Sequence, residues 1–247
     1  MIKFALCGGL GRMGRAISSL CEQSGEFLPF IVEHPLKASE GIFSDLSQVI
    51  KDVDLVVDFA ATPKESVKFA NLCAREKKPL IIGTTGHSKE ELSQIQNLSS
   101  EIAILIAPNM SLGVNLLFKL ARLACKALKD KGFDAEILEI HHRNKKDAPS
   151  GTALKLESIV MEALNLNKSV HSREGISPRG EEVSTLALRG GDVIGEHTLF
   201  LLGYGERLEL THRASSREIF ARGCLEAIKW IINKPPGIYS MEDVLGI

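Results

Sequence analysis

Short runs of apolar residues alternate with amphipathic stretches through the first 108 residues of the chain. Runs bounded by turn residues predict strands, and stretches whose apolar residues recur every three or four positions predict helices. The run Ile-Ala-Ile-Leu-Ile at 102–106 is apolar on both faces, as expected when helices cover both sides of a parallel sheet. The pattern predicts a doubly wound α/β unit with strands at 3–7, 27–33, 55–59, 80–83 and 103–107, and helices at 12–24, 64–77 and 88–98.

A different pattern follows residue 109 and predicts a second unit of the α+β type. Glycine-rich turns at 190–192 and 203–205 separate the last strands, which indicates a mainly antiparallel sheet. A final helix must end before Pro235, since proline cannot continue a helix. Periodicity alone does not say which unit this helix joins. The expected elements are helices at 114–129, 152–164 and 216–232, and strands at 135–142, 184–189, 197–202 and 207–211.

The composition is that of a globular protein with one large domain or two modest ones. The chain has 247 residues, of which 44% are apolar and 25% charged, and a chain of this kind can bury a substantial core. Thirty Lys and Arg against 31 Asp and Glu leave a net charge of −1. The chain therefore has no overall positive field to hold a nucleic acid or an anionic membrane, and we expect neither partner.

The cysteines and the N-terminus indicate a reducing compartment. Five scattered cysteines without a C-x-x-C pair argue against a disulfide framework and against a structural zinc site. The apolar run at 1–7 leads directly into glycines and lacks the charged start and cleavage pattern of a signal peptide. The stretch 102–118 is interrupted by Pro108 and by polar residues, so it is not expected to span a bilayer. These features predict a cytoplasmic protein.

A glycine cluster directly after the first expected strand has the spacing of a dinucleotide-binding loop. Gly9, Gly11 and Gly14 form G-x-G-x-x-G between a strand and a helix, which is the context that this motif requires. Without Cβ atoms the turn can tighten, and a pyrophosphate can approach the backbone N–H groups at the helix start. We predict that this loop binds the cofactor through Gly8, Gly9, Leu10, Gly11, Arg12 and Met13.

Glu33 closes the second expected strand and lies at the distance from the glycine loop that the motif predicts. An acid there accepts hydrogen bonds from the hydroxyls of the adenosine ribose, which favours NADH. The next residue is His34, and Arg12 or Lys37 could reach a 2′-phosphate, which would favour NADPH. We therefore assign Glu33 and His34 to the cofactor site, with NADH and NADPH both open.

The densest group of chemically active side chains lies at 139–153. Ser150 can cap the helix expected after it, and the N–H groups of Gly151 and Thr152 can then receive a carboxylate. We call Ser150, Gly151 and Thr152 the carboxylate seat and predict that they bind an anionic substrate. The structural alternative is a basic surface loop that leads into an ordinary capped helix.

Two adjacent histidines and a lysine belong to the same segment. His141 and His142 are expected at the end of a strand, where neighbouring side chains point to opposite faces. A metal shared between them is therefore disfavoured, and the sequence has no H-E-x-x-H motif. We predict no metal, and we expect one histidine to face the reacting atoms while the other contacts another part of the substrate.

This segment resembles the dihydrodipicolinate reductase family, whose members are also called 4-hydroxy-tetrahydrodipicolinate reductases. Residues 139–153 match the family signature E-x-H-H-x-x-K-x-D-A-P-S-G-T-A. The resemblance spans essentially the whole chain. Other similar segments are the nucleotide loop at 8–14, G-T-T-G at 83–86, the nicotinamide-side loop at 107–111, R-G-G-D at 189–192, G-E-H-T at 195–198 and T-H-R-A-S-S-R at 211–217.

The resemblance implies an enzyme of the lysine and diaminopimelate pathway. The reaction would reduce 4-hydroxy-tetrahydrodipicolinate, a small dicarboxylate, to tetrahydrodipicolinate, with a hydride from NADH or NADPH and loss of water. The implied roles are proton donor or acceptor for His141, proton donor for Lys145, substrate contact for His142, and carboxylate binding for Gly151 with Thr152. The resemblance also implies that the cofactor contacts Gly83, Thr84, Thr85, Ala107, Pro108, Asn109 and Met110.

Domain organisation and assembly also follow from the resemblance. It implies a Rossmann-like dinucleotide-binding domain of residues 1–110 and 217–247, to which the C-terminal helix returns. Residues 111–216 would form a domain for substrate binding and oligomerisation, and the family assembles as homotetramers through this domain. We expect the same architecture and the same assembly here.

Two other functions remain open at this point. The chain could be an NAD(P)-dependent dehydrogenase that acts on another small carboxylated substrate. It could also be a nucleotide-sensing module without catalysis. His141, Lys145 and the carboxylate seat argue against the sensing module, since a module without catalysis has no need of them.

Overall fold

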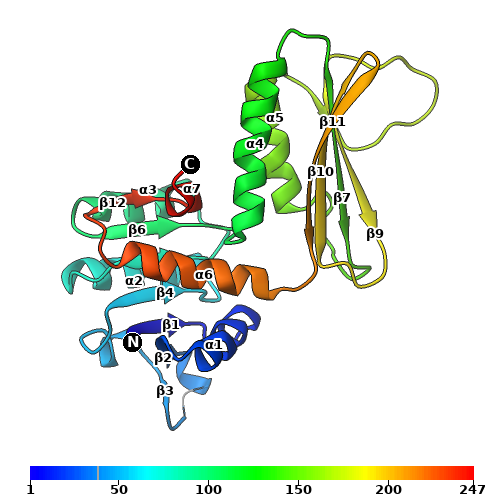
Figure 1. Cartoon of the computed structure of the whole chain (residues 1–247). Helices are drawn as coiled ribbons and strands as arrows, with labels where there is room; N and C mark the ends of the chain where they lie inside the picture. The colour runs from blue at the N-terminus through cyan, green and yellow to red at the C-terminus, as the bar shows by residue number, and fades with distance from the viewer. Residues whose placement is uncertain (38) are drawn as a thin grey trace. The chain divides into compact units, whose positions relative to one another are not determined.

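The computed structural model describes residues 1–37 and 39–247 of the chain. These residues form two compact units, which can be followed in Figure 1. One unit consists of Met1–Leu112 together with Glu218–Ile247, and the other of Gly113–Arg217. The C-terminal segment therefore joins the first unit, which its periodicity alone did not say.

The first unit is built on a seven-stranded sheet in which all neighbouring strands are parallel. The strand order is β12-β6-β5-β4-β1-β2-β3. The Rossmann-like parallel sheet predicted by the apolar runs is confirmed. Its strands are β1 (Ile2–Cys7), β2 (Phe27–Val32), β3 (Ile42–Phe43), β4 (Leu55–Asp58), β5 (Leu80–Ile82), β6 (Ala103–Ile106) and β12 (Gly237–Tyr239).

Helices cover both faces of this sheet because side chains alternate along each strand. On β1, Phe4 and Leu6 belong to one buried core, and Ala5 and Cys7 belong to the other. The first core is closed by α1, α6 and α7, and the second by α2 and α3. These helices are α1 (Arg12–Ser24), α2 (Pro63–Arg75), α3 (Lys89–Asn97), α6 (Glu218–Ile231) and α7 (Met241–Leu245), with 3₁₀ helices at Pro35–Lys37, Leu46–Gln48 and Leu98–Ser100.

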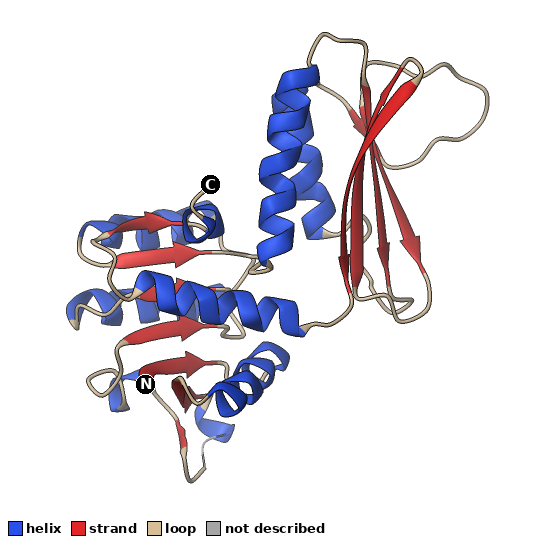
Figure 2. Ribbon diagram, viewed as in Figure 1, coloured by secondary structure: helices blue, strands red, loops and turns tan. Residues whose placement is uncertain are grey.

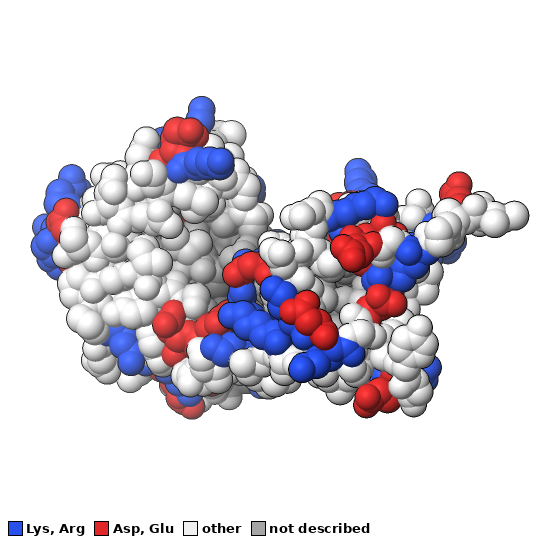
Figure 3. Space-filling view, turned by 90° about the horizontal axis from the view of Figure 1, so that it is seen from above, with Lys and Arg blue, Asp and Glu red and all other residues white. Residues whose placement is uncertain are grey.

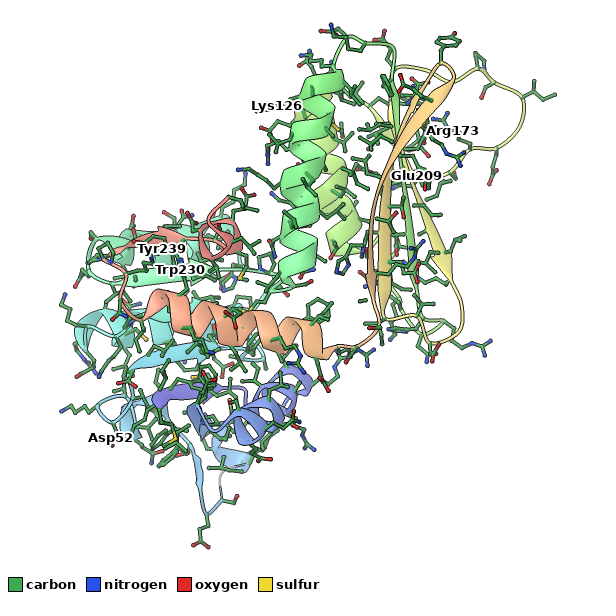
Figure 4. All side chains as sticks on the ribbon, viewed as in Figure 1. Asp52, Lys126, Arg173, Glu209, Trp230 and Tyr239 are labelled. Carbon is green, nitrogen blue, oxygen red and sulfur yellow. The ribbon has the colours of Figure 1, made fainter. Side chains whose placement is uncertain are left out.

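The edge strand β12 was not expected from the sequence. It pairs with β6 and places Ile238 beside Ile104. The ring of Tyr239, the last residue of β12, meets the Trp230 ring of α6 edge-on at a centroid distance of 5.1 Å. Both side chains are labelled in Figure 4. The Tyr239 hydroxyl also donates a hydrogen bond to the Pro235 carbonyl oxygen (2.9 Å). A strand of this length shows no period of its own, so these contacts specify it.

The second unit has a five-stranded mixed sheet in the order β11-β10-β7-β9-β8. Most of the pairing is antiparallel, because β10 runs antiparallel to both of its neighbours. The pairs β7 with β9 and β8 with β9 are parallel, which the turn residues did not predict. A parallel pair needs a crossover connection, and the helix after β7 supplies it. The strands are β7 (Asp134–His141), β8 (Ser169–Val170), β9 (Val183–Arg189), β10 (Gly195–Gly203) and β11 (Glu206–Ala214).

The helices α4 (Leu112–Leu128) and α5 (Gly151–Leu164) pack on the same face of this sheet. Their core includes Leu117 and Val160, which pack with Ile137 and Leu199 of the strands. Figure 2 shows both helices on one side of the sheet. Within residues 113–217, all of which are described, the opposite face of the sheet carries no helix.

Charged side chains of both signs are mixed on the surface drawn in Figure 3, in keeping with the net charge of −1. Ion pairs such as Arg122–Glu162 (3.0 Å) and Lys77–Glu101 (2.8 Å) contribute to this mixture. Among the helices in the described part of the chain, none combines the length and the apolar character needed to cross a membrane.

Candidate active site

Helix α1 begins without a side-chain cap, directly after the glycine loop. Its N-cap is Gly11, which provides no side-chain hydrogen bond, and its first turn carries no acid. The starts of α3 and α5, in contrast, are capped by Ser88 and Ser150. Because first-turn N–H groups carry the positive end of the helix dipole, an uncapped helix start is suited to a bound phosphate group.

Close backbone packing requires the glycines of this loop. Gly8 has a φ of +78°, and a Cβ there would lie 2.2 Å from the Phe59 carbonyl oxygen. A Cβ at Gly14 would lie 2.3 Å from the Gly9 carbonyl oxygen, and a Cβ at Gly83 would lie 2.2 Å from the Phe59 ring. Side chains at these positions would push the chain apart. The segments that follow β1, β4 and β5 therefore meet closely at one edge of the sheet.

A cleft of about 360 Å³ lies at this edge. It is formed at the carboxyl ends of the parallel strands, where open α/β sheets bind their ligands. The cleft brings together the glycine loop and the turn at 83–85, which lie far apart in the sequence. Phe59, Ala60 and Ala61 also line it and were not predicted. The lining residues are Gly8, Gly11, Arg12, Met13, Phe59, Ala60, Ala61, Gly83, Thr84 and Thr85.

Glu33 lines a second cleft of about 570 Å³, which shares part of its lining with the first. Its Oε1 accepts a hydrogen bond from the Leu10 N–H (2.9 Å), and Lys37 Nζ lies 3.7 Å from its Oε2. His34 and Lys68 line the same cleft. Asp45 and Glu65 line it as well, so acidic and basic side chains are mixed in this cleft. This mixture does not by itself distinguish binding of a ribose hydroxyl from binding of a 2′-phosphate.

The predicted nicotinamide-side loop at 107–110 lies at the carboxyl end of β6, next to β5 in the sheet. Ala107 and Met110 are buried. Pro108 is exposed and Asn109 is partly exposed. Within this loop, Pro108 and Asn109 are the residues whose side chains a ligand can reach.

Buried Asp58 at the end of β4 joins the loops of this edge and was missed from the sequence. Its carboxylate accepts hydrogen bonds from the Ala60 N–H (2.7 Å), Ser66 Oγ (2.5 Å) and Thr84 Oγ1 (2.9 Å). Burial raises the pKa of the Asp58 carboxyl, and the three hydrogen bonds act in the opposite direction. A charged residue that closes an otherwise apolar strand is the signal that could have identified it.

In the second unit, Glu139 and His141 lie two positions apart on β7 and therefore face the same side of the sheet. Nδ1 of His141 donates a hydrogen bond to Oε2 of Glu139. The buried Glu139 also accepts hydrogen bonds from the Ser150 N–H (3.0 Å) and from Arg189 Nη2 (2.7 Å). Burial raises the pKa of the Glu139 carboxyl, but the hydrogen bonds from His141 and Arg189 outweigh it and lower the pKa to about 2.

His197 joins this group from the neighbouring strand β10. It lies opposite Glu139 in the antiparallel register, and its ring meets the His141 ring edge-on at a centroid distance of 5.1 Å. Its Nε2 lies 3.1 Å from Ser150 Oγ, which also accepts a hydrogen bond from the Ala153 N–H (3.2 Å). Burial lowers the pKa of His197 to about 4, so this ring is neutral at pH 7.

Lys145 lies on the loop between β7 and α5. Its Nζ is 2.9 Å from both carboxylate oxygens of Asp147, and this hydrogen bonding lowers the pKa of Asp147. Arg189 Nη2 donates a hydrogen bond to the Asp147 carbonyl oxygen (2.6 Å) as well as to Glu139. Arg189 therefore links the Lys145 loop to the buried pair of Glu139 and His141.

The carboxylate seat lies at the start of α5. Ser150 is buried, and its N–H and its hydroxyl both make hydrogen bonds inside the protein. Gly151 is exposed, and a Cβ there would meet nothing within 4 Å, so a ligand can approach its backbone. Thr152 is partly exposed, as is His142, which follows the last residue of β7.

Comparison with known proteins points to one family. The family profile described as Dihydrodipicolinate reductase, N-terminus matches residues 2–110, and the profile described as Dihydrodipicolinate reductase, C-terminus matches residues 113–245. The chain belongs to the dihydrodipicolinate reductase family. A 4-hydroxy-tetrahydrodipicolinate reductase of Aquifex aeolicus is 50% identical to it, covering 100% of this chain and 99% of its own. One of Geotalea daltonii is 43% identical, with both chains covered completely.

A solved structure of the same family has the same fold. The dihydrodipicolinate reductase of Paenisporosarcina sp. TG-14, with dipicolinate bound, has a TM-score of 0.83 against this chain at 26% identity. The match covers 98% of this chain and 99% of the other. The family membership confirms the predicted activity, which is reduction of 4-hydroxy-tetrahydrodipicolinate in lysine biosynthesis with NADH or NADPH.

Three residues of this reductase lie in the site although the sequence motifs that contain them suggest no role. Glu139 could have been found, because it lies two positions before His141 and so shares its face of the strand. Arg189 and His197 could not, since their proximity depends on strand pairing. In the register of the sheet, Arg189 lies opposite His141, and His197 lies opposite Glu139.

Two of these residues, Glu139 and His197, form with His141 a group that raises the question of a metal in this reductase. One potential ligand atom from each of Glu139, His141 and His197 lies within 4.8 Å of the others. The sequence predicted no metal, because adjacent histidines cannot share one and His197 has no ligand spacing to them. The guanidinium of Arg189, 2.7 Å from Glu139, already supplies the positive charge that a metal would bring.

Proposed function

We propose that 4-hydroxy-tetrahydrodipicolinate binds at the His141 end of the second unit, and that His141 and Lys145 transfer protons to or from it. One observation carries this proposal. Arg189 holds the buried pair of Glu139 and His141 and the loop of Lys145 together, beside the exposed backbone at Gly151. Positive groups concentrated at one place attract a dicarboxylate, and the Paenisporosarcina reductase has the dicarboxylate dipicolinate bound.

The carboxylate seat would hold one carboxylate of this substrate. The first-turn N–H groups of Gly151 and Thr152 are suited to receive it. We assign Ser150 the role of shaping the seat. Its N–H and its hydroxyl already form hydrogen bonds with Glu139, with His197 and with the Ala153 N–H of α5. His142 would contact another part of the substrate.

The reaction needs loss of water, a hydride and a proton. Loss of the 4-hydroxyl group as water leaves a conjugated ring, to which the reduced nicotinamide supplies a hydride. As the hydride arrives, electron density rises at another atom of the ring, and the Lys145 ammonium can protonate that atom. His141 donates or accepts a proton in the same sequence. A positioned acid or base of this kind commonly contributes about 10² to 10⁴ in rate.

The first unit would bind NADH or NADPH in its two clefts. The uncapped start of α1 is suited to the pyrophosphate, Glu33 to the adenosine ribose, and the loops at 83–85 and 107–110 to the nicotinamide side. His34 and Lys37 line the same cleft as Glu33, where they would contact the 2′-phosphate of NADPH. We place the enzyme in the cytoplasm, where unpaired thiols such as its five buried cysteines persist.

The direct test is turnover of the product of dihydrodipicolinate synthase by the purified protein, with NADH and NADPH in parallel reactions. We expect substrate-dependent loss of the reduced-nicotinamide absorbance with both. The two rates should lie within about tenfold of each other, because an exposed ion pair such as Lys37 with a 2′-phosphate is worth about 1 kcal/mol or less. No loss with either nucleotide would contradict the proposal, and faster turnover of another carboxylated compound would favour a different dehydrogenase.

We propose that no metal takes part in this reaction. A divalent cation between Glu139 and the two rings would lie close to the Arg189 guanidinium, and like charges repel strongly in a buried site. The same assay with and without EDTA should therefore give the same rate. A loss of rate that returns on addition of zinc would show that the group around His141 binds a metal.

We propose that the enzyme is a homotetramer assembled through the uncovered face of the second sheet. Leu186 and Leu188 of β9 and Leu202 of β10 are exposed on this face. It also carries partly buried Ile140 and Phe200, on the side away from the core formed by α4 and α5. An apolar surface of this extent is characteristic of a protein interface, and the family resemblance implies that further copies of the chain cover it.

Sedimentation equilibrium should give four times the 26.9 kDa mass of the chain. Leu188→Glu should lower this mass, because it places a charge on the uncovered face, where Leu188 is 51% exposed. Leu208→Glu is the matched control, since Leu208 is also an exposed leucine (41%) but lies opposite Leu201, on the helix side of the sheet. A monomeric wild type, or equal effects of the two variants, would contradict the proposed interface.

A further inference from the structure

Glu139 receives hydrogen bonds from three separate parts of the second unit. The donors are His141 Nδ1 on the same strand, the Ser150 N–H at the start of α5, and Arg189 Nη2 at the end of β9. The Glu139 side chain has no exposed surface, so solvent does not compete for these bonds. Because it is covered, any influence of Glu139 on a substrate must pass through the groups that it holds.

The charge of Glu139 determines which nitrogen of His141 carries a proton. An ionised carboxylate only accepts hydrogen bonds, so Nδ1 of His141 must be the protonated nitrogen. Nε2 is then the nitrogen that gains or loses a proton during the reaction. When His141 is doubly protonated, the adjacent carboxylate also stabilises the positive ring.

The other titratable groups near this pair come from each neighbouring element of the sheet. Among the groups that the structure describes there, Glu139 is the anion in direct contact with His141. The nearby carboxylate of Asp147 is paired with Lys145 (2.9 Å). The remaining groups are cations or histidines, so they cannot take the place of Glu139. They are Arg189 on β9, His197 on β10, His212 on β11 and Lys145 on the loop after β7.

Glu139 also influences the loop that carries Lys145. This loop leaves β7 directly after His141 and ends at Ser150, and both of these residues donate hydrogen bonds to the same carboxylate. In the middle of the loop, Arg189 binds the Asp147 carbonyl oxygen while it pairs with Glu139. The two proposed proton-transfer residues are therefore tied to one buried charge.

We propose that Glu139 is the positioning residue of this active site. It fixes the tautomer and the orientation of His141, and through Arg189 and Ser150 it holds the loop that presents Lys145. The carboxylate that orients the histidine of a Ser-His-Asp triad acts on an imidazole in the same way. This inference rests on the proposed roles of His141 and Lys145.

The first test is Glu139→Gln, which keeps the size of the side chain and removes its charge. We expect kcat to fall by about a hundredfold or more, since the imidazole loses its fixed tautomer. The KM for NADH should stay within about twofold of the wild-type value, because the nucleotide clefts are built by the other unit. The pH profile of kcat/KM should differ from that of the wild type, because a neutral amide replaces the carboxylate that accepts the hydrogen bond from His141 Nδ1.

Glu157→Gln is the matched control. Glu157 is also a buried glutamate of the second unit, and it accepts hydrogen bonds from His171 Nε2 (3.1 Å) and Thr185 Oγ1 (2.5 Å). We expect this variant to lose stability without a shift of the pH profile, when rates are expressed per folded molecule. If Glu139→Gln behaves in the same way, Glu139 is merely structural and the inference is overturned.

Two further measurements keep the test decisive. Nitrogen-15 NMR of the histidine rings, with His141→Gln for assignment, should show the Nδ1-protonated tautomer in the wild type and its loss in Glu139→Gln. Glu139→Asp, which keeps the charge, should lower kcat while retaining the wild-type pH profile. This variant replaces Glu139→Gln if Glu139→Gln fails to fold.

An unchanged tautomer in Glu139→Gln, or a shifted pH profile in Glu139→Asp, overturns the inference. A wild type with the fixed tautomer but without turnover overturns the proposed function instead.

Discussion

Replacement of Lys145 by alanine is expected to lower kcat about a thousandfold, equivalent to roughly 4 kcal/mol of transition-state stabilisation. The ammonium of Lys145 is the group that we assign to protonation of the ring. In this structure it is held by both oxygens of Asp147, at 2.9 Å, and its side chain is 21% exposed. Removal of the ammonium leaves the hydride transfer without a positioned acid. The dissociation constants for NADH and NADPH should not change, because the nucleotide clefts belong to the other unit.

Lys146→Ala is the matched control for this variant. Lys146 is the next residue on the same loop and is exposed, so its removal changes the charge of the loop equally. We expect Lys146→Ala to retain kcat within about threefold of the wild type, as is usual for a surface substitution. Single-turnover kinetics with each nucleotide measure both variants. A parallel loss of kcat and of nucleotide affinity in Lys145→Ala would mean that the lysine only supports the fold.

Replacement of Gly8 by alanine is expected to weaken the binding of both nucleotides about a hundredfold, which corresponds to roughly 3 kcal/mol. Gly8 has a φ of +78°, which strains any residue with a Cβ. The new methyl group would lie 2.2 Å from the Phe59 carbonyl oxygen. The segment after β4 would have to move, and it forms part of the lining of both clefts.

Gly25→Ala separates the strain of the backbone from the damage to the clefts. Gly25 also has a positive φ, of +65°, but a Cβ there would meet nothing within 4 Å, and the residue lies at the far end of α1. This variant should lose stability and keep its nucleotide affinity. Isothermal titration with NADH and NADPH gives both constants. Equal affinities of Gly8→Ala and the wild type would show that the glycine loop does not bind the nucleotide.

The long elements of the fold follow from sequence periodicity. The helix expected at 12–24 is α1 (Arg12–Ser24), and the helix expected at 152–164 is α5 (Gly151–Leu164) to within one residue. Both have several turns over which an apolar face repeats. The strands β3, β8 and β12 were missed, because each has only two or three residues and none is a run of three apolar residues like the equally short β5 (Leu80–Ile82). Such strands form where a longer neighbour offers free backbone groups.

In the second unit, the direction of the strands was harder to predict from the sequence than their positions. The turn residues at 190–192 and 203–205 predicted antiparallel neighbours, and this is correct for β10 with β11. The strand before the turn at 190–192, however, lies beside β7 and not beside β10, and it runs parallel to β7. A turn marks where a strand ends, but the partner of that strand depends on which position in the sheet buries its apolar face.

The sequence by itself determined those parts of the two candidate sites whose groups are neighbours along the chain. The glycine loop and the segment from His141 to Thr152 belong to this class, because a helix start and the loop before it present their groups to a ligand without help from distant residues. Only the tertiary structure decided the surroundings of His141. Arg189 meets Glu139 from 50 residues away along the chain, and His197 lies opposite Glu139 on another strand. The physical reason is that strand register determines which remote side chains lie beside the same buried charge. Register is set by hydrogen bonds between strands and by burial of one face, and the local periodicity of the sequence does not reveal it.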